Sequence, residues 1–260
     1  MRLQLVTRFA IAALAASPVA PLAAPLVAPL VAQTDTSAHA TFHIVPRRPI
    51  EALRAEALRL TVPDGLAGTR AADLVELERL DATVKLDIRY AGTNNFMGTA
   101  MYSQPRAFLQ RPAAEAAVRA HRALAREGYG LLIHDAYRPW YVTWMFWEAT
   151  PDSQHTFVAN PATGSRHNRG AAVDLTLYDL RTGQPVRMPS GYDEFSERAY
   201  PSYTGGTATE RARRELLRRY MEAEGFTVNP TEWWHFDYQA WREYPVLNLP
   251  FEKLGAAPGR

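Results

Sequence analysis

Alternation of apolar and polar positions predicts a strand near the middle of the chain. Val173, Leu175 and Leu177 alternate with Asp174 and Thr176, which is the period of two expected for a strand with one buried face. The pattern therefore holds Asp174 on a rigid element. Residues 83–90 alternate in the same way, with Val84, Leu86, Ile88 and Tyr90 on one face and Lys85, Asp87 and Arg89 on the other.

Shorter apolar runs predict further strands. They lie at residues 131–133, at 184–188 after a hairpin turn at 179–183, and around His235. The loops at 91–98 and 150–166 hold turn residues without a helical or strand period. Such loops can form walls of a site when they join rigid elements.

Spacing of three to four between apolar residues predicts helices at 112–127, at 139–147 and at about 207–224. Pro112 suits a first helical turn, and Gly128 and Gly225 suit helix ends. His121 falls on an apolar stripe, which favours a structural role. A short amphipathic helix is expected near residue 50, with Ile50, Leu53 and Leu58 on one side.

Residues 1–32 have the layout of a secretory signal peptide. The segment contains Arg2 and Arg8, then an alanine-rich apolar run, then small residues ending at Ala32. Its four prolines disfavour a membrane-spanning helix, although an uncleaved anchor or a disordered tail remains an alternative. Cleavage after Ala32 and cleavage after Ala40 are both open.

Composition excludes several classes of protein. The 260 residues are 47% hydrophobic, which is ordinary for one sizeable globular domain. Without the first 32 residues, 27 basic and 27 acidic side chains remain, and no basic stripe suggests nucleic acid. The chain has no cysteine, so a metal site must use histidine and carboxylate ligands.

His167 and Asp174 form half of a possible zinc site. Gly170 lies between them and permits a tight backbone approach, so the imidazole can meet the carboxylate. A pair of this kind alone is more often a loop histidine and a solvent-facing aspartate. His235 supplies a third ligand and leaves a fourth position for water, the arrangement of a catalytic zinc.

Two further side chains fit hydrolysis at such a zinc. Glu232 lies three residues before His235, so we expect it in the turn or bulge that begins the strand. There it can take a proton from water and pass it to a leaving amine. Arg138, at the polar end of the 131–133 strand, can stabilise the oxyanion that develops on a carbonyl.

The joint pattern resembles the zinc D-alanyl-D-alanine dipeptidases of the vancomycin-resistance type, in peptidase family M15. It contains S-x-H-x-x-G-x-A-x-D at residues 165–174 and E-W-W-H at 232–235, with D-A-Y-R-P at 135–139 and R-Y-A at 89–91 followed by Asn95, Phe96 and Gly98. The similarity covers roughly residues 74–244.

The resemblance implies an α+β fold: a single domain with a central antiparallel sheet flanked by helices and a zinc site on the sheet. It implies one Zn²⁺ per chain held by His167, Asp174 and His235, with Glu232 as the base and Arg138 beside the scissile carbonyl.

By the same resemblance, Asp193 meets the free amine of the dipeptide, and Tyr90 and Ser165 line the pocket. Glu194 is the competitor for the role of Asp193, because the assignment depends on aligning a turn. His134 departs from the family pattern, which leaves open a supporting role or an altered pocket wall.

The sequence thus predicts a signal peptide at 1–32, a linker and short helix at 33–62, and a zinc dipeptidase domain at 63–260. The expected reaction is hydrolysis of D-Ala-D-Ala from cell-wall precursors or turnover products, after secretion to the periplasm and without stable membrane insertion. Alternatives are a peptidoglycan D,D-carboxypeptidase or L,D-endopeptidase, and a non-catalytic zinc-containing wall-binding module. The oligomeric state is not indicated.

Overall fold

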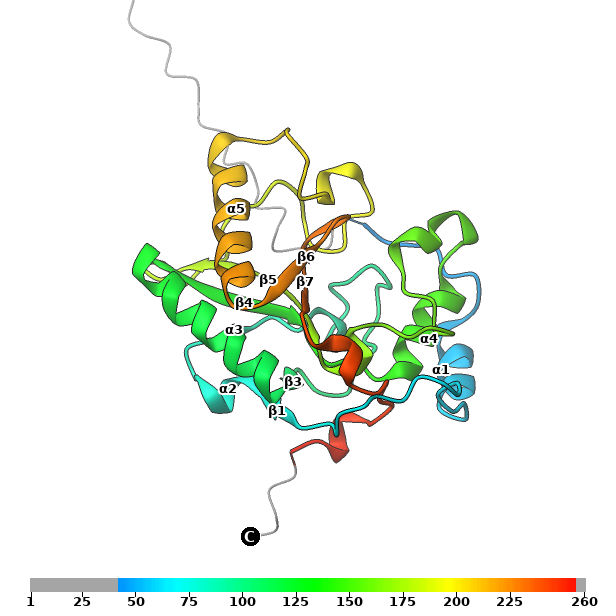
Figure 1. Cartoon of the computed structure of the whole chain (residues 1–260). Coiled ribbons are helices and arrows are strands. Elements are labelled where there is room, and N and C mark those ends of the chain that lie inside the picture. The colour runs from blue at the N-terminus through cyan, green and yellow to red at the C-terminus, as the bar shows by residue number, and fades with distance from the viewer. Residues whose placement is uncertain (1–41, 256–260) are drawn as a thin grey trace, which may run out of the picture. The chain divides into compact units, whose positions relative to one another are not determined.

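A computed structural model describes residues 42–255 (Figure 1). The predicted signal peptide lies outside the described residues. The regular elements, in chain order, are α1 (Ile50–Ala57), β1 (Leu74–Glu76), α2 (Leu77–Leu80), β2 (Lys85–Leu86), β3 (Phe108–Gln110), α3 (Arg111–Leu124), β4 (Tyr129–Asp135), α4 (Trp140–Ala149), β5 (Ala172–Asp179), α5 (Ala208–Ala223), β6 (Phe226–Asn229) and β7 (Glu232–Tyr238).

Five strands form the main sheet in the order β2-β4-β5-β7-β6. The pairs from β4 to β6 are antiparallel, whereas β2 runs parallel to β4. Strands β1 and β3 form a separate antiparallel pair. The α+β prediction is confirmed, with a sheet that is mixed at one edge.

Strand β5 lies at the centre of this sheet, and its residues 172–178 are all buried. The prediction of a single buried face was wrong, because Thr176 is only 2% exposed. A central strand has neighbours on both edges and packing on both faces, so its polar residues are enclosed as well. Asp174 is therefore inside the protein.

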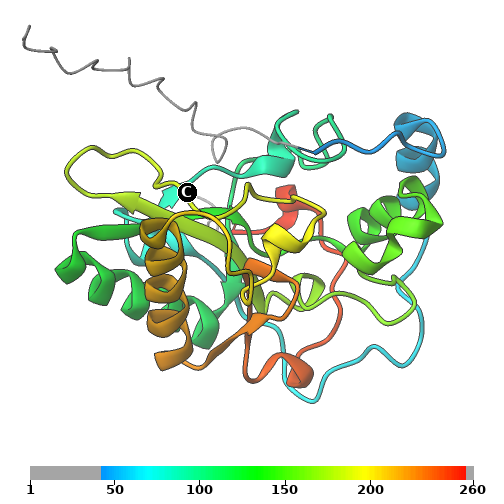
Figure 2. The same ribbon diagram turned by 90° about the horizontal axis from the view of Figure 1, so that it is seen from above.

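Helices α3 and α5 pack against each other and against the sheet (Figure 2). Pro112 stands in the first turn of α3, as predicted, and Gly128 follows in a left-handed conformation. Thr207 and Glu210 form a reciprocal capping box at the start of α5. The helix predictions for 112–127 and 207–224 are confirmed to within a turn.

One predicted strand is shorter than its alternation suggested, and another is replaced by a single bridge. The 83–90 strand is reduced to β2, and a 3₁₀ turn at Arg89–Ala91 replaces its end. Arg89 was expected on the polar face but is 3% exposed, because its Nε pairs with Asp87 at 2.6 Å. At 184–188 the structure has an isolated bridge between Tyr178 and Pro185 in place of a strand.

Residues 42–58 pack against the elements that follow. Helix α1 contacts α4, and the amide of Ile44 donates to the carbonyl of Phe96. Leu53 is fully buried, whereas Leu58 lies beyond the helix and is 62% exposed, so its predicted place on the apolar side was wrong. None of the helices in residues 42–255 is long and apolar enough to cross a membrane.

Candidate metal centre and active-site pocket

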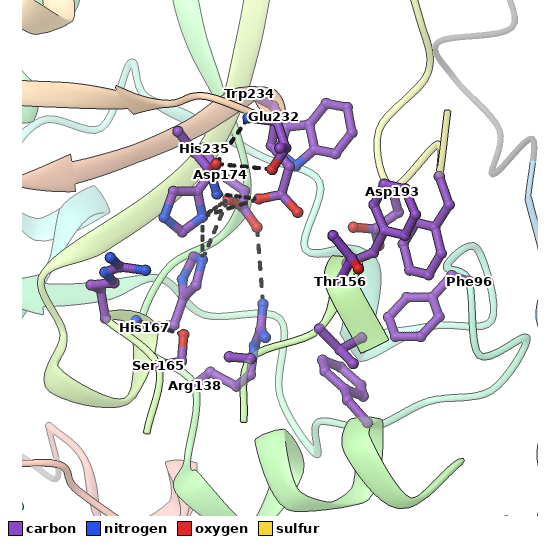
Figure 3. A pocket seen from close by; sticks show the side chains of 18 of the residues that line it. Phe96, Arg138, Thr156, Ser165, His167, Asp174, Asp193, Glu232, Trp234 and His235 are labelled. Atoms are coloured by element: carbon purple, nitrogen blue, oxygen red, sulfur yellow. Dashed lines mark hydrogen bonds and ion pairs between the residues drawn. The ribbon is translucent and has the colours of Figure 1, made fainter. Parts of the chain in front are cut away.

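His167, Asp174 and His235 meet at one point of the sheet (Figure 3). Asp174 on β5 and His235 on β7 are direct partners in the antiparallel ladder, which places their side chains close together. His167 belongs to the 3₁₀ turn His167–Arg169, which ends at Gly170 with a φ of 62°. That left-handed conformation favours glycine, and a Cβ at this position would also lie 2.4 Å from a methyl group of Leu74.

The three candidate ligand atoms form a nearly equilateral triangle. Nε2 of His167 lies 3.3 Å from Oδ1 of Asp174, and Nδ1 of His235 lies 3.0 Å from it. The two nitrogens are 3.1 Å apart. Ligands in a tetrahedral zinc site with bonds of about 2.0–2.1 Å are about 3.3 Å apart. The spacing therefore fits zinc.

The far nitrogen of each imidazole has an acceptor. Nδ1 of His167 lies 2.7 Å from the carbonyl of Ala136, and Nε2 of His235 lies 2.8 Å from Oδ1 of Asp237. Donation to these acceptors leaves a lone pair on each inner nitrogen, as metal-ligating histidines require. Sequence reasoning missed Asp237, although its spacing of two from His235 puts both on one face of β7.

Tyr192 holds the second oxygen of Asp174. Its buried hydroxyl donates to Oδ2 at 3.0 Å, whereas Oδ1 is buried without a hydrogen bond from the described residues. A buried carboxylate oxygen without a hydrogen bond destabilises the folded state. Here that oxygen faces the two imidazole nitrogens. This is the arrangement of a carboxylate that offers one oxygen to a cation. Nothing in the apolar pattern marked Tyr192.

The charges of the metal-free cluster also favour a cation. Burial opposes ionisation of Asp174, but the neighbouring His167 and His235 lower the pKa of its carboxyl well below the ordinary value. Burial likewise lowers the pKa of His235, but the neighbouring carboxylates of Asp174 and Asp237 outweigh this effect and raise the pKa to about 10. A proton therefore sits where a metal cation would bind.

Glu232 is the first residue of β7, beside an irregularity in its pairing with β6. That position agrees with the expected bulge. Side chains three apart on a regular strand face opposite sides, so the irregularity accounts for Glu232 and His235 lining one pocket. Oε2 of Glu232 accepts from Asn229 and lies 3.7 Å from Nδ1 of His235. Burial raises the pKa of its carboxyl, which suits a proton acceptor near neutral pH.

Arg138 follows β4 and enters the pocket beneath the cluster. Its Nε and Nη2 both donate to Oδ2 of Asp135, at 3.0 and 2.7 Å, and Nη2 lies 4.0 Å from Asp174. Its guanidinium also lies over the rings of Tyr90 and Phe146. The cation is thus fixed in place before any substrate arrives.

Asp193 lies on the opposite side of the pocket from His167 and Ser165 (Figure 3). Its φ of 55° is left-handed, and it is 8% exposed. Oδ2 accepts from the hydroxyl of Tyr90 at 2.7 Å. Burial raises the pKa of its carboxyl well above the ordinary value, and the charges of Asp174 and Glu232 add to this.

The competing acid, Glu194, is used within its own loop. Its carboxylate accepts from the amide of Gly191 and the hydroxyl of Ser196. It is not among the residues that line the pocket. Ser165 does line it, and its Oγ accepts from the amide of His167 at 3.2 Å.

The pocket has a volume of about 260 Å³. Its lining includes Phe96 from the 91–98 loop and Phe157 from the 150–166 loop, so both loops form walls as expected. Phe157 stacks on Phe195 at 4.7 Å, and Phe195 contacts Phe96 at 5.3 Å. Sequence reasoning did not bring these three rings together, because they come from three separate loops.

His134 lies outside the pocket lining and behind Tyr192, with the two rings 4.8 Å apart. Its Nδ1 lies 3.4 Å from Asp87, and burial lowers the pKa of its imidazole. Of the two roles left open for His134, the contacts fit the supporting one.

Comparison with known proteins gives consistent matches. The family model of peptidase M15, described as D-ala-D-ala dipeptidase, matches residues 70–249. A D-alanyl-D-alanine dipeptidase of Escherichia coli is 35% identical over 175 residues, 67% of this chain and 89% of the relative. One from Enterococcus faecium is 34% identical over 194 residues, 68% of this chain and 95% of the relative. One from Streptomyces coelicolor is 31% identical, over 63% and 90% of the two chains.

Proposed function

The chain belongs to the D-Ala-D-Ala dipeptidase family of M15 peptidases, and from this premise we propose that it hydrolyses D-Ala-D-Ala with one zinc ion held by His167, Asp174 and His235. The family is zinc-dependent. The observation that carries the proposal is the triangle of ligand atoms with edges of 3.0–3.3 Å. It lies in a pocket that has a buried carboxylate at one end.

A bound zinc ion would supply Lewis acidity and lower the pKa of water. Glu232 accepts the proton that water loses and returns it to the nitrogen of the leaving D-alanine. Its raised pKa and its position 3.7 Å from His235 support this role. A site that only held a structural metal would have no use for a buried acid there, which argues against the wall-binding module.

Arg138 stabilises the negative charge that develops on the oxygen of the scissile carbonyl. The pair with Asp135 holds the guanidinium 4.0 Å from Asp174. A preorganised cation of this kind needs no rearrangement as the charge develops, which is where such groups gain their effect.

Asp193 binds the free ammonium of the dipeptide, with Tyr90 orienting its carboxylate and Ser165 lining the pocket near His167. Burial disfavours the ionised form of the Asp193 carboxyl. A bound ammonium stabilises that ionised form, whereas an uncharged amide does not. The aromatic wall formed by Phe96, Phe157 and Phe195 lines the same pocket. Together they favour a dipeptide over a longer chain.

We further propose that residues 1–32 direct secretion and that the mature enzyme acts in the periplasm. Residues 33–62 would link the cleavage site to the domain at 63–260. In that compartment, dipeptides from cell-wall turnover are within reach of the pocket.

Release of D-alanine from D-Ala-D-Ala by the zinc-loaded protein tests the proposal, with intact muropeptide as the competing substrate. We expect rapid release from the dipeptide and little from muropeptide. Preference for muropeptide would instead identify a D,D-carboxypeptidase or an L,D-endopeptidase. Binding to muropeptide without hydrolysis of either compound would identify a wall-binding module.

A further inference from the structure

The substrate proposed above carries two charges, and so far only its ammonium has a partner. A free dipeptide also ends in a carboxylate, which loses part of its hydration when the dipeptide enters the pocket. Leaving such a charge without a partner disfavours binding. A second charged residue is therefore expected on the far side of the metal ligands from Asp193.

The arginines that line the pocket are Arg138 and Arg166. Arg138 already gives Nε and Nη2 to Asp135, and its side chain is 9% exposed. It also lies close to Asp174, where it serves the scissile carbonyl. Arg138 is thus poorly placed to bind a second oxygen acid.

Arg166 is more exposed than Arg138, and fewer of its hydrogen-bond donors are in use. Its side chain is 46% exposed, and its ion pair with Asp237 runs through Nε at 3.3 Å. Within residues 42–255 its two terminal amino groups donate no hydrogen bond. The guanidinium lies over the ring of Trp241 at 4.8 Å, which holds its plane without using those donors. Two parallel N–H donors are the geometry that binds a carboxylate.

The position of Arg166 in the chain fits the far end of the substrate. In the chain, Arg166 lies between Ser165 and His167. Figure 3 shows Ser165 and His167 on one side of Arg138 and Asp174. Asp193 lies on the other side. A dipeptide spans about 7 Å. A cation and an anion on opposite sides of the metal ligands can pair with the two charged ends of such a molecule.

We propose that Arg166 binds the terminal carboxylate of the substrate. This inference rests on the dipeptidase function proposed above and adds a specificity-determining residue to it. Together, Arg166 and Asp193 would recognise a zwitterion with one peptide bond between its charges.

D-Ala-D-Ala and D-Ala-D-alaninamide, which lacks the terminal charge, test this assignment. We expect the unmutated zinc-loaded protein to favour the free acid by on the order of thirtyfold in kcat/KM. In Arg166→Met the ratio should fall towards one, chiefly through a higher KM for the acid, while zinc content persists. Arg166→Lys should keep part of the preference, because the charge remains.

Arg242→Met is the matched control. The guanidinium of Arg242 also lies over the ring of Trp241, at 4.2 Å, but Arg242 is not among the pocket-lining residues. Its variant should keep the full preference for the free acid. Binding of D-Ala-D-Ala to zinc-loaded Glu232→Gln, with and without Arg166→Met, gives a readout independent of turnover, and we expect weaker binding in the double variant.

Normal turnover with an unchanged acid-to-amide ratio in Arg166→Met would overturn the Arg166 assignment and leave the dipeptidase function standing. Absence of turnover with either compound in the unmutated protein would instead overturn the proposed function on which the assignment rests.

Discussion

The metal cluster and the two ends of the pocket are built in different ways. Asp174 and His235 are register partners on adjacent strands, and His167 is held by a turn that ends at a glycine. Asp193 and Arg166, by contrast, stand on loops. Asp193 adopts a left-handed conformation and contacts Tyr90, 103 residues away. Two of the three candidate metal ligands and Glu232 therefore lie on strands, whereas the charged residues at the two ends of the pocket lie on loops.

This difference suggests that the two functions can be separated by mutation. Changes in the cluster should abolish metal binding or turnover with any substrate. Changes at the loop-borne ends should alter which substrate is accepted while leaving the metal in place, since residues on helices and strands are held more precisely than residues on loops.

The largest effect is expected from His235→Ala, which should lose the zinc. Three ligands cannot spare one, and the change also leaves Asp237 without its imidazole partner. Metal analysis after gel filtration measures the zinc content per chain. His43→Ala removes an exposed imidazole elsewhere and should keep one zinc per chain. Full zinc in His235→Ala would remove this residue from the ligand set.

Glu232→Gln should keep the zinc and lose turnover by on the order of a hundredfold or more, because it preserves volume and removes the base. Steady-state hydrolysis of D-Ala-D-Ala and metal analysis on one preparation measure both quantities. Near-normal turnover would mean that another group carries the proton.

Asp193→Asn should raise KM for D-Ala-D-Ala roughly thirtyfold, because a charged hydrogen bond to the ammonium is lost. Asparagine tolerates the left-handed backbone, and zinc content should not change. Glu194→Gln is the neighbouring control and should leave KM near normal. Equal shifts in the two variants would show that the loop, and not the Asp193 charge, governs binding.

The apparent zinc affinity should rise about tenfold per pH unit between pH 6 and 8. The pKa of His235 in the metal-free protein is raised to about 10, so the imidazole is protonated throughout this range. Zinc needs the neutral form, and a higher pH removes the competing proton. Competition with a chelator at constant ionic strength measures the zinc affinity at each pH. A zinc affinity independent of pH would contradict the protonation of His235 in the metal-free protein.

The strand-borne half of the site followed from the sequence, and the loop-borne half did so only in part. Asp174 was placed by alternation, and Glu232 by its odd spacing from His235. Both depend on local periodicity, which a single sequence contains.

Tyr192, Phe157 and Phe195 could not be found in this way, because their places depend on contacts between loops far apart in the chain. The alternation at 83–90 misled for a related reason. The ion pair with Asp87 and the contact with the ring of Tyr192 allow Arg89 to be buried, and neither is visible as a pattern.

The central claim is that a strand-borne zinc centre acts between loop-borne charges that admit only a free dipeptide. The ratio of kcat/KM for D-Ala-D-Ala and N-acetyl-D-Ala-D-Ala in the unmutated, zinc-loaded protein tests it most directly. Acetylation removes the ammonium and leaves the Asp193 carboxylate buried without a cationic partner, so we expect a preference for the free dipeptide of roughly thirtyfold or more. Comparable values for the two compounds would contradict the claim, since an endopeptidase cleft open at that end would not distinguish them.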